Sequence, residues 1–142
     1  MLFKKIAISR FSRTLGTLIA TGVSVLQALE IVAETSGNAV VAKAIMRSRK
    51  SIKEGETIAK PLAKSRVFPP MVTQMIAVGE ETGALETMLG KIADFYDSEV
   101  SATVDALTSL IEPMLIIVMG LVIAGILVSL YLPMFSVVTM IK

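Results

Sequence analysis

Several chemically versatile residue types are missing from this 142-residue chain, which contains no cysteine, no histidine and no tryptophan. Without cysteine there are no disulfide bonds and no thiolates to act as nucleophiles or metal ligands. Without histidine there is no imidazole to bind a metal or to exchange protons near neutral pH. The sequence therefore excludes disulfide scaffolds, thiolate or imidazole metal sites, and catalysis by cysteine or histidine.

The beginning of the chain lacks the apolar core of a secretory signal peptide. After Lys4 and Lys5, polar and apolar residues alternate, and the cations Arg10 and Arg13 interrupt the segment. A signal peptide has an uninterrupted apolar stretch at this place. We therefore expect no export by cleavage of a leader.

Charge is absent from residues 113 to 141, and residues 114 to 132 are apolar on every helical face. The hydrocarbon core of a bilayer is about 30 Å thick and is crossed by roughly 20 apolar residues in a helix. We therefore predict that residues 113–142 form a transmembrane helix and a short tail. The alternative is a buried core helix, but a soluble domain of this size has no interior that would cover such a helix all round.

The preceding residues, 1–112, are enough for one folded domain of ordinary size. The composition is 54% hydrophobic and dominated by aliphatic residues that favour helices. Apolar residues at helical spacing and the Gly and Pro residues between them predict six helices. The expected helices cover residues 6–20, 24–36, 38–54, 57–65, 71–82 and 84–111. The predicted fold is all-α, an antiparallel six-helix bundle followed by one C-terminal transmembrane helix.

Local signals define the ends of several helices. Ser24 and Gln27 form a capping box, and Asn38 is a good N-cap for the third helix. Gly83 is a typical C-cap for the fifth helix. Gly79, inside that helix, is tolerable if another backbone packs against it.

The first helix has a clear apolar face, and its polar residues are expected to point away from the core. Ile8, Phe11 and Leu15 recur at helical spacing on the apolar face. We expect Ser9, together with the nearby arginines, to face the opposite way.

The two signs of charge are separated along the chain. Residues 1–66 contain twelve lysines and arginines against four acids, whereas residues 67–112 contain one lysine against eight acids. The two halves could pair internally, or they could present a basic and an acidic face to different partners. Because every lysine and arginine except Lys142 precedes the predicted span, we expect a cytoplasmic helical domain and a periplasmic C-terminus.

Five segments, in one order along nearly the whole chain, resemble the type II secretion system F family. They are residues 10–18 (RFSRTLGTL), 22–29 (GVSVLQAL), 68–71 (FPPM), 79–85 (GEETGAL) and 110–113 (LIEP). This family comprises the PilC/GspF-like inner-membrane platform proteins of type II secretion systems and type IV pili. Its members have two such helical domains, each followed by membrane helices. This chain has one, and it looks like the C-terminal half.

The resemblance implies a non-enzymatic platform in the bacterial inner membrane. Such a platform lies beneath the growing pilus or pseudopilus and couples a cytoplasmic assembly ATPase to pilin or pseudopilin subunits. The implied partners are that ATPase, pilins or pseudopilins, other inner-membrane assembly proteins, membrane lipid and further copies of the chain. No cofactor is implied. The alternative is a membrane-anchored regulatory or oligomerising helical protein whose span associates with itself.

Acidic residues gather around the connection between the fifth and sixth helices. Glu80, Glu81, Asp94 and Asp97 are candidates for binding a hard cation such as Ca²⁺, which needs six or more oxygen ligands. No loop has the alternating Asp and Asn of a dedicated calcium site. Asp94 and Asp97 also have the spacing of a general acid and base, but no other catalytic residue type lies near them. We therefore expect no metal, and a solvated or internally paired acidic face.

Basic residues gather on the first and third helices. The candidates for partner binding are Arg10, Arg13, Arg47, Arg49, Lys50 and Lys53. Nucleic-acid binding would require interleaved aromatic residues or a known module, and neither is present. An acidic protein partner and anionic lipid headgroups are both compatible with these cations, as is a solvated helix end.

The predicted span contains two further features. Gly120 and Ala124, and then Gly125 and Ser129, place small residues four apart, which lets helix backbones approach closely; the alternative is a plain lipid-facing anchor. Glu112-Pro113 is the only break expected before the span. We predict that it acts as a hinge between the sixth helix and the membrane helix.

Overall fold

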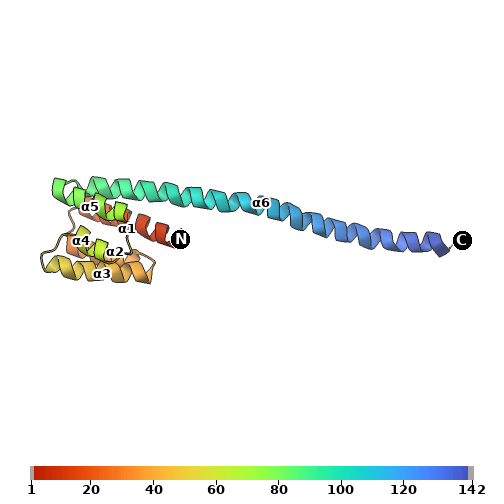
Figure 1. The fold of residues 1–142 in the computed structure, drawn as a ribbon, viewed down its shortest axis with the longest axis horizontal. Coiled ribbons are helices and arrows are strands. Elements are labelled where there is room, and N and C mark those ends of the chain that lie inside the picture. Colours follow the sequence, from red (N-terminus) through yellow and green to blue (C-terminus); the bar gives the residue numbers. More distant parts are fainter. Residues whose placement is uncertain (1, 141–142) are drawn as a thin grey trace. The chain divides into compact units, whose positions relative to one another are not determined.

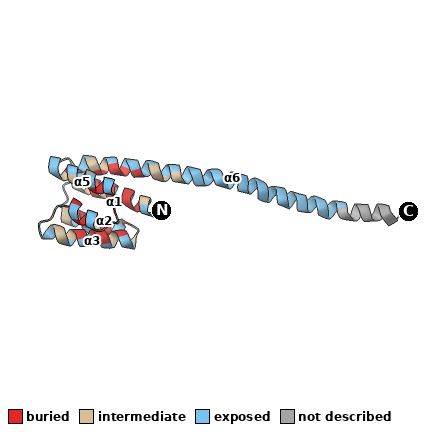
Figure 2. Ribbon diagram, viewed as in Figure 1, coloured by how far each residue is buried: buried red, intermediate tan, exposed pale blue. Residues whose placement is uncertain are grey.

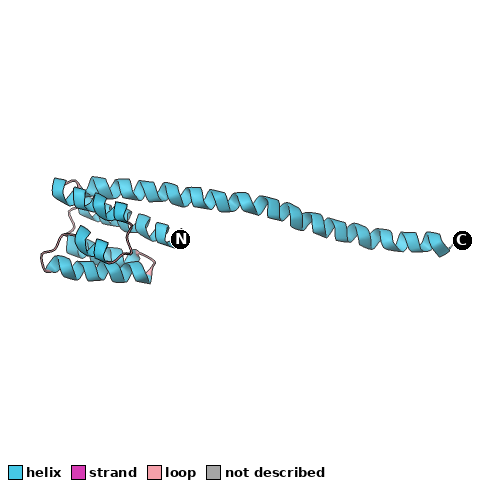
Figure 3. Cartoon of the chain, in the orientation of Figure 1, coloured by secondary structure: helices cyan, strands magenta, loops and turns pink. Residues whose placement is uncertain are grey.

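The computed structural model describes residues 2–140, and side chains as far as residue 131. Every regular element in this part of the chain is an α-helix, so the all-α prediction is confirmed (Figure 3). The antiparallel arrangement of the whole bundle stays a prediction. In order along the chain (Figure 1), the helices are α1 (Leu2–Ala20), α2 (Val25–Thr35), α3 (Ala39–Lys53), α4 (Ala59–Lys64), α5 (Pro70–Thr82) and α6 (Leu85–Met140).

Contacts divide the chain into two units, Met1–Ala102 and Thr103–Lys142. The first unit holds α1 to α5 and the beginning of α6, and it contains the hydrophobic core (Figure 2). Within it α1 packs against α2, α2 against α3, α3 against α4, and α4 against α5. The predicted boundary between residues 112 and 113 stays a prediction.

The helix ends follow the local signals in the sequence. The Ser24 side chain accepts a hydrogen bond from the backbone N–H of Gln27 at 3.4 Å. The Asn38 side chain accepts from the N–H groups of Val40 and Val41 at 2.9 and 3.2 Å. These interactions satisfy backbone donors that a helix leaves without a partner in its first turn.

Gly79 lies where α5 and α6 approach each other closely. A Cβ atom added at this position would lie 2.8 Å from the Cα of Leu85 and 3.2 Å from the Cβ of Met88, both on α6. Only glycine leaves room for that approach, as expected for a glycine inside a helix. Four residues later Gly83 has φ +69°, a left-handed conformation that ends α5 and lets the chain turn back into α6.

The buried face of α1 is wider than the sequence predicts. Ile8, Phe11 and Leu15 are fully buried, as expected, and the Phe11 ring lies 4.8 Å from the ring of Phe68 between centroids. The prediction that Ser9 faces away from the core is wrong, because only 7% of Ser9 is exposed. Its hydroxyl donates a hydrogen bond to the side chain of Asp97 on α6, so a second face of α1 is covered by α6.

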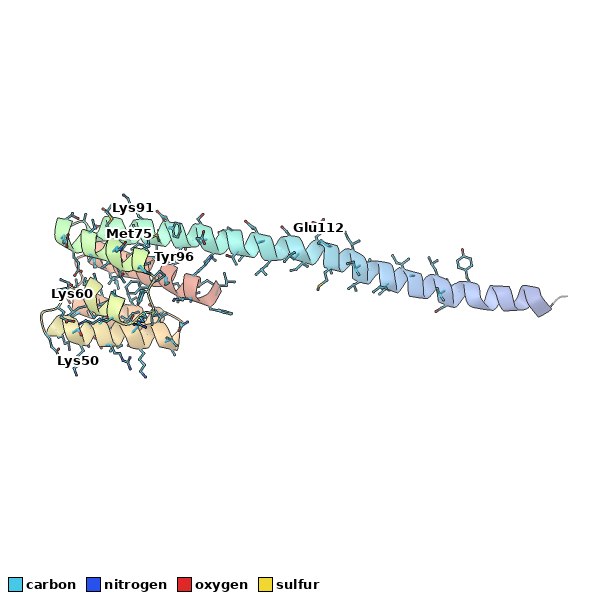
Figure 4. The ribbon with its side chains drawn as sticks, viewed as in Figure 1. Lys50, Lys60, Met75, Lys91, Tyr96 and Glu112 are labelled. Atoms are coloured by element: carbon cyan, nitrogen blue, oxygen red, sulfur yellow. The ribbon has the colours of Figure 1, made fainter. Side chains whose placement is uncertain are left out.

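The expected break at Glu112-Pro113 is absent from the helix. One uninterrupted α-helix, α6, runs from Leu85 to Met140 through both residues, so the sixth helix and the predicted membrane helix are a single element (Figure 4). Pro113 removes one backbone donor from the ladder, and the turns on either side hold the helix together. The hinge at Glu112 and Pro113 stays a prediction.

By length and composition, α6 is long and apolar enough to cross a membrane, and it is the one such helix in the described part of the chain. None of its most apolar stretch is buried against the rest of the chain. Ile116 and Leu121, for example, are 66% and 70% exposed. This exposure argues against the alternative of a core helix buried within this chain.

Candidate functional site

Ionic and hydrogen-bonded contacts join α1 to the first part of α6. Lys5 pairs with Glu99 at 2.8 Å, and Arg13 pairs with Asp94 at 3.0 Å and with Asp97 at 2.5 Å. The basic and acidic halves of the chain therefore pair internally along this contact. As the residue number rises along α1 it falls along α6, so these two segments run in opposite directions.

Asp97 is held in its charged form by two partners. The hydrogen bond from Ser9, and then the one from Arg13, lower the pKa of Asp97 below its ordinary value. In turn the hydrogen bonds to Asp97 and Asp94 raise the pKa of Arg13. Asp94 and Asp97, two of the candidates for metal binding or acid–base chemistry, therefore serve as ion-pair partners of Arg13 in this structure.

Glu80 caps a helix that is distant in sequence. Its two carboxylate oxygens accept hydrogen bonds from the backbone N–H groups of Ile58 at 2.5 Å and Ala59 at 3.0 Å, at the beginning of α4. The residue at the N-cap of α4, Ile58, has no side-chain oxygen to cap the helix itself. Among the described residues no three acidic side chains form a group that could hold a metal ion. Of the four candidates for metal binding, Glu80, Asp94 and Asp97 therefore have hydrogen-bond or ion-pair partners within the chain. The fourth, Glu81, is exposed.

The cations of α3 fall into two groups. Arg49 turns back onto α2, where it donates to the carbonyl of Leu26 at 2.9 Å and to the carboxylate of Glu30 at 2.7 Å. Lys50 and Lys53 are exposed, and Figure 4 shows Lys50 extending outward from α3. Ion pairing within the chain therefore partly neutralises the charges of Arg49 and Arg13, although the Arg13 side chain stays exposed.

A groove of about 600 Å³ lies between α3 and α4, and we call it the α3–α4 groove. Every charged residue that lines it is a cation. The lining residues are Ala39, Val40, Lys43, Ala44, Arg47, Ser51, Pro61, Lys64, Ser65 and Val67.

Only one of the groove's cations is among the residues singled out by sequence. Arg47 is a predicted candidate for partner binding, whereas Lys43 and Lys64 are not among the predicted candidates. Lys43 lies four residues before Arg47 on α3, and this spacing was a signal that could have found it. Lys64 comes from another helix, so only tertiary packing shows that it belongs to the same hollow.

A second hollow, of about 470 Å³, lies beside the connection from α4 to α5. Its charged lining residues, Lys4 and Arg66, are both cations, and the other lining residues include Phe68 and Pro69. Residues 63–68 contribute to both hollows, so the basic surface continues around the end of α4.

Partner binding by Arg10 and helix packing on the small residues of α6 both stay predictions. Arg10 is exposed, and its guanidinium lies close to Gly37 at the end of α2. On α6 a Cβ added at Gly120 or Gly125 would meet no described atom within 4 Å, and the Ser129 hydroxyl donates to the Gly125 carbonyl at 2.8 Å. Packing of another helix on Gly120, Ala124, Gly125 and Ser129 stays a prediction.

Comparison with known proteins places the chain in a family. The family model described as type II secretion system (T2SS), protein F, matches residues 11–133. The chain belongs to the type II secretion system protein F family. Members of the family that it is similar to carry names from both pilus assembly and secretion.

Two relatives are named for pilus assembly and one for secretion. The chain is 55% identical over 133 residues to the type IV pilus assembly protein PilC of Myxococcus xanthus, covering 94% of this chain and 32% of that protein. It is 45% identical to PilC of Thermus thermophilus, over 95% of this chain and 34% of that protein. It is 33% identical to the type II secretion system protein F of Pseudomonas aeruginosa, over 90% of this chain and 32% of that protein. The chain thus spans about a third of the length of these family members.

Proposed function

We propose that this chain is part of a non-enzymatic inner-membrane platform for assembly of a type IV pilus or a type II secretion pseudopilus. The observation that carries the proposal is the match to the type II secretion system protein F family over residues 11–133. The chain is 55% identical to a type IV pilus assembly protein and 33% identical to the type II secretion system protein F of Pseudomonas aeruginosa, which favours the pilus over the secretion machine.

The proposed place in the cell follows from α6 and from the charge distribution. The apolar part of α6 would cross the inner membrane, because it is long enough and is exposed throughout. All lysines and arginines except Lys142 precede the span, so the folded unit would lie in the cytoplasm and the C-terminus in the periplasm. This topology would put the helical unit on the side where ATP is available.

The proposed role is to couple a cytoplasmic assembly ATPase to pilin subunits in the membrane. Exposed cations of the folded unit, Arg10 among them, would contact acidic surfaces of the ATPase or of other assembly proteins. Arg13 and Arg49 would contribute less, because their side chains are already paired within the chain.

Co-purification tests this role. The full chain in detergent micelles should retain the assembly ATPase of its bacterium at low salt, and Arg10→Glu should weaken retention about tenfold. Lys91→Glu is the matched control, because Lys91 is an exposed cation on α6 outside the candidate set (Figure 4). Equal retention by both variants would remove Arg10 from the docking surface.

A genetic experiment tests the function itself. Deleting the coding sequence of this chain should abolish surface filaments or secretion through the type II machine, and restoring it should recover them. Normal filaments and normal secretion in the deletion strain would overturn the proposed function.

A further inference from the structure

The charge and shape of the α3–α4 groove lead to one further inference. We propose that this groove binds an acidic amphipathic helix of a partner protein. The proposal deepens the docking role given above by naming the chemistry of the partner, and it rests on the proposed function only for the place of that partner in the assembly.

The charge of the groove selects a negative ligand. Its charged lining residues are Lys43, Arg47 and Lys64, with no acid among them. Lys64 already pairs with Glu56 at 3.0 Å. Among the described residues Lys43 and Arg47 have no ion-pair partner, and both are exposed, so their charges are available to a ligand.

The apolar floor of the groove argues for a protein segment rather than a small anion. The residues between and beside the cations are mainly apolar, and Val40, on the same face of α3, is 65% exposed. A phosphate or a lipid headgroup would use the cations but leave this floor in contact with water. An amphipathic helix would cover the floor with its apolar stripe and place carboxylates over the rim.

The spacing along α3 matches a helical ligand. The lining of α3 extends from Ala39 to Ser51, which is about 18 Å along the helix axis, or roughly three turns of a partner helix. Lys43 and Arg47 are four residues apart and so lie on one face of α3, about 6 Å apart along the axis. Two carboxylates at positions i and i+4 of a partner helix have the same spacing, so both ion pairs could form together.

Direct binding to a designed peptide tests the proposal. The probe is a fluorescein-labelled helical peptide of about four turns with glutamates at i and i+4 and a leucine stripe beside them. It is titrated against the full chain in zwitterionic detergent, with fluorescence anisotropy as the measurement. Two control peptides separate the contributions: one has serine in place of the leucines, and the other has lysine in place of the glutamates.

Matched variants show whether the groove is the binding site. The double variant Lys43→Glu with Arg47→Glu should weaken peptide binding at least about tenfold, because both rim cations become repulsive. Lys50→Glu with Lys53→Glu makes the same change of charge on α3 outside the groove lining and should weaken it less than about threefold. Val40→Ser should weaken peptide binding a few-fold, and the salt dependence of peptide binding should stay the same.

Three outcomes would overturn the proposal. The first is equal loss of binding in the two double variants, which would indicate a general charge effect. The second is equal binding of the leucine and serine peptides, which would show that the apolar floor takes no part. The third is that short-chain phosphatidylglycerol, a soluble anionic lipid, competes away the peptide whereas a phosphatidylcholine of the same length does not; this would assign the site to lipid headgroups.

The groove proposal and the proposed function fail in different experiments. Loss of filaments in the deletion strain with no specific peptide binding would overturn the groove and leave the platform. Specific peptide binding with normal filaments and secretion in the deletion strain would support the groove and overturn the platform.

Discussion

The carboxylate of Glu80 on α5 accepts a hydrogen bond from the backbone N–H of Ile58, 22 residues earlier, at 2.5 Å. Ile58 stands at the beginning of α4, a helix of six residues that is too short to be stable by itself. The second carboxylate oxygen accepts from Ala59 at 3.0 Å, so one side chain satisfies two backbone donors. Glu80 therefore fixes the position of α4, which forms one wall of the α3–α4 groove.

Removing this cap should destabilise the folded unit. Glu80→Ala leaves two N–H groups at buried residues without an acceptor, and we expect a loss of about 1–3 kcal/mol in the free energy of unfolding. Hydrogen exchange of the Ile58 and Ala59 amides should accelerate more than that of α2. Glu81→Ala is the control, because Glu81 is exposed, and it should change neither quantity. Unchanged exchange at Ile58 in Glu80→Ala would refute the capping role.

Two glycines in the folded unit should respond in opposite directions to alanine. Gly79→Ala places a Cβ 2.8 Å from the backbone of Leu85, and we expect it to destabilise the unit by about 1–3 kcal/mol. Gly90→Ala, inside α6, meets no atom within 4 Å and should stabilise the helix by about 0.5–1 kcal/mol. Chemical unfolding of the full chain in micelles, followed by circular dichroism, measures both. Similar effects of the two changes would contradict the close approach of α5 and α6.

The contact between α1 and α6 should make stability depend on pH. The pKa of Asp97 is lowered in the folded chain, first by the hydrogen bond from Ser9 and then by Arg13. The unfolded chain therefore takes up the proton at higher pH than the folded chain does. The stabilisation that Asp97 contributes is complete above about pH 5 and is lost as the pH falls through the lowered pKa. Asp97→Asn should therefore lose less stability than the parent between about pH 5 and pH 2.

Two comparisons check the assignment to Asp97. Asp105→Asn changes an exposed acid on α6 and should keep the acid sensitivity of the parent. Ser9→Ala should raise the pKa of Asp97 toward its ordinary value, as measured by NMR titration of the carboxyl carbon, because it removes the larger of the two causes. A pKa of Asp97 that is the same in Ser9→Ala and the parent would be evidence against the hydrogen bond.

The features that the sequence predicts correctly are those decided within a few residues. Asn38 caps the helix that follows it immediately, and Gly83 ends α5 through its own backbone conformation. The feature that it misses at Glu80 depends on a partner 22 residues away, and no local pattern distinguishes a capping glutamate from a solvated one. The prediction for Ser9 is wrong for the same reason, because the burial of Ser9 depends on its contact with Asp97 on another helix.

The α3–α4 groove and α6 also show which features the local sequence predicts and which depend on the rest of the structure. Arg47 could be selected from its helix alone, but the hollow beside it exists only because α4 packs against α3. Pro113 is a strong local signal for a break, yet the helix continues through it, because the hydrogen-bonded turns on both sides outweigh one missing hydrogen bond. The same missing bond leaves a local weakness, which is the physical basis for the predicted hinge.

A spectroscopic measurement tests that hinge. Because the chain has no native cysteine, spin labels can be attached at Ala106→Cys and Ala124→Cys, on either side of Pro113. Pro113→Ala restores the backbone donor and removes the clash of the ring with the preceding turn, a change of about 3 kcal/mol in favour of straight helix. We expect the distance distribution between the labels to narrow in Pro113→Ala. The control is a label pair at Ile116→Cys and Ala124→Cys, which does not span Pro113 and should give a distance distribution of the same width in both proteins. If the pair that spans Pro113 gives equally wide distributions with proline and with alanine, Pro113 is not a hinge.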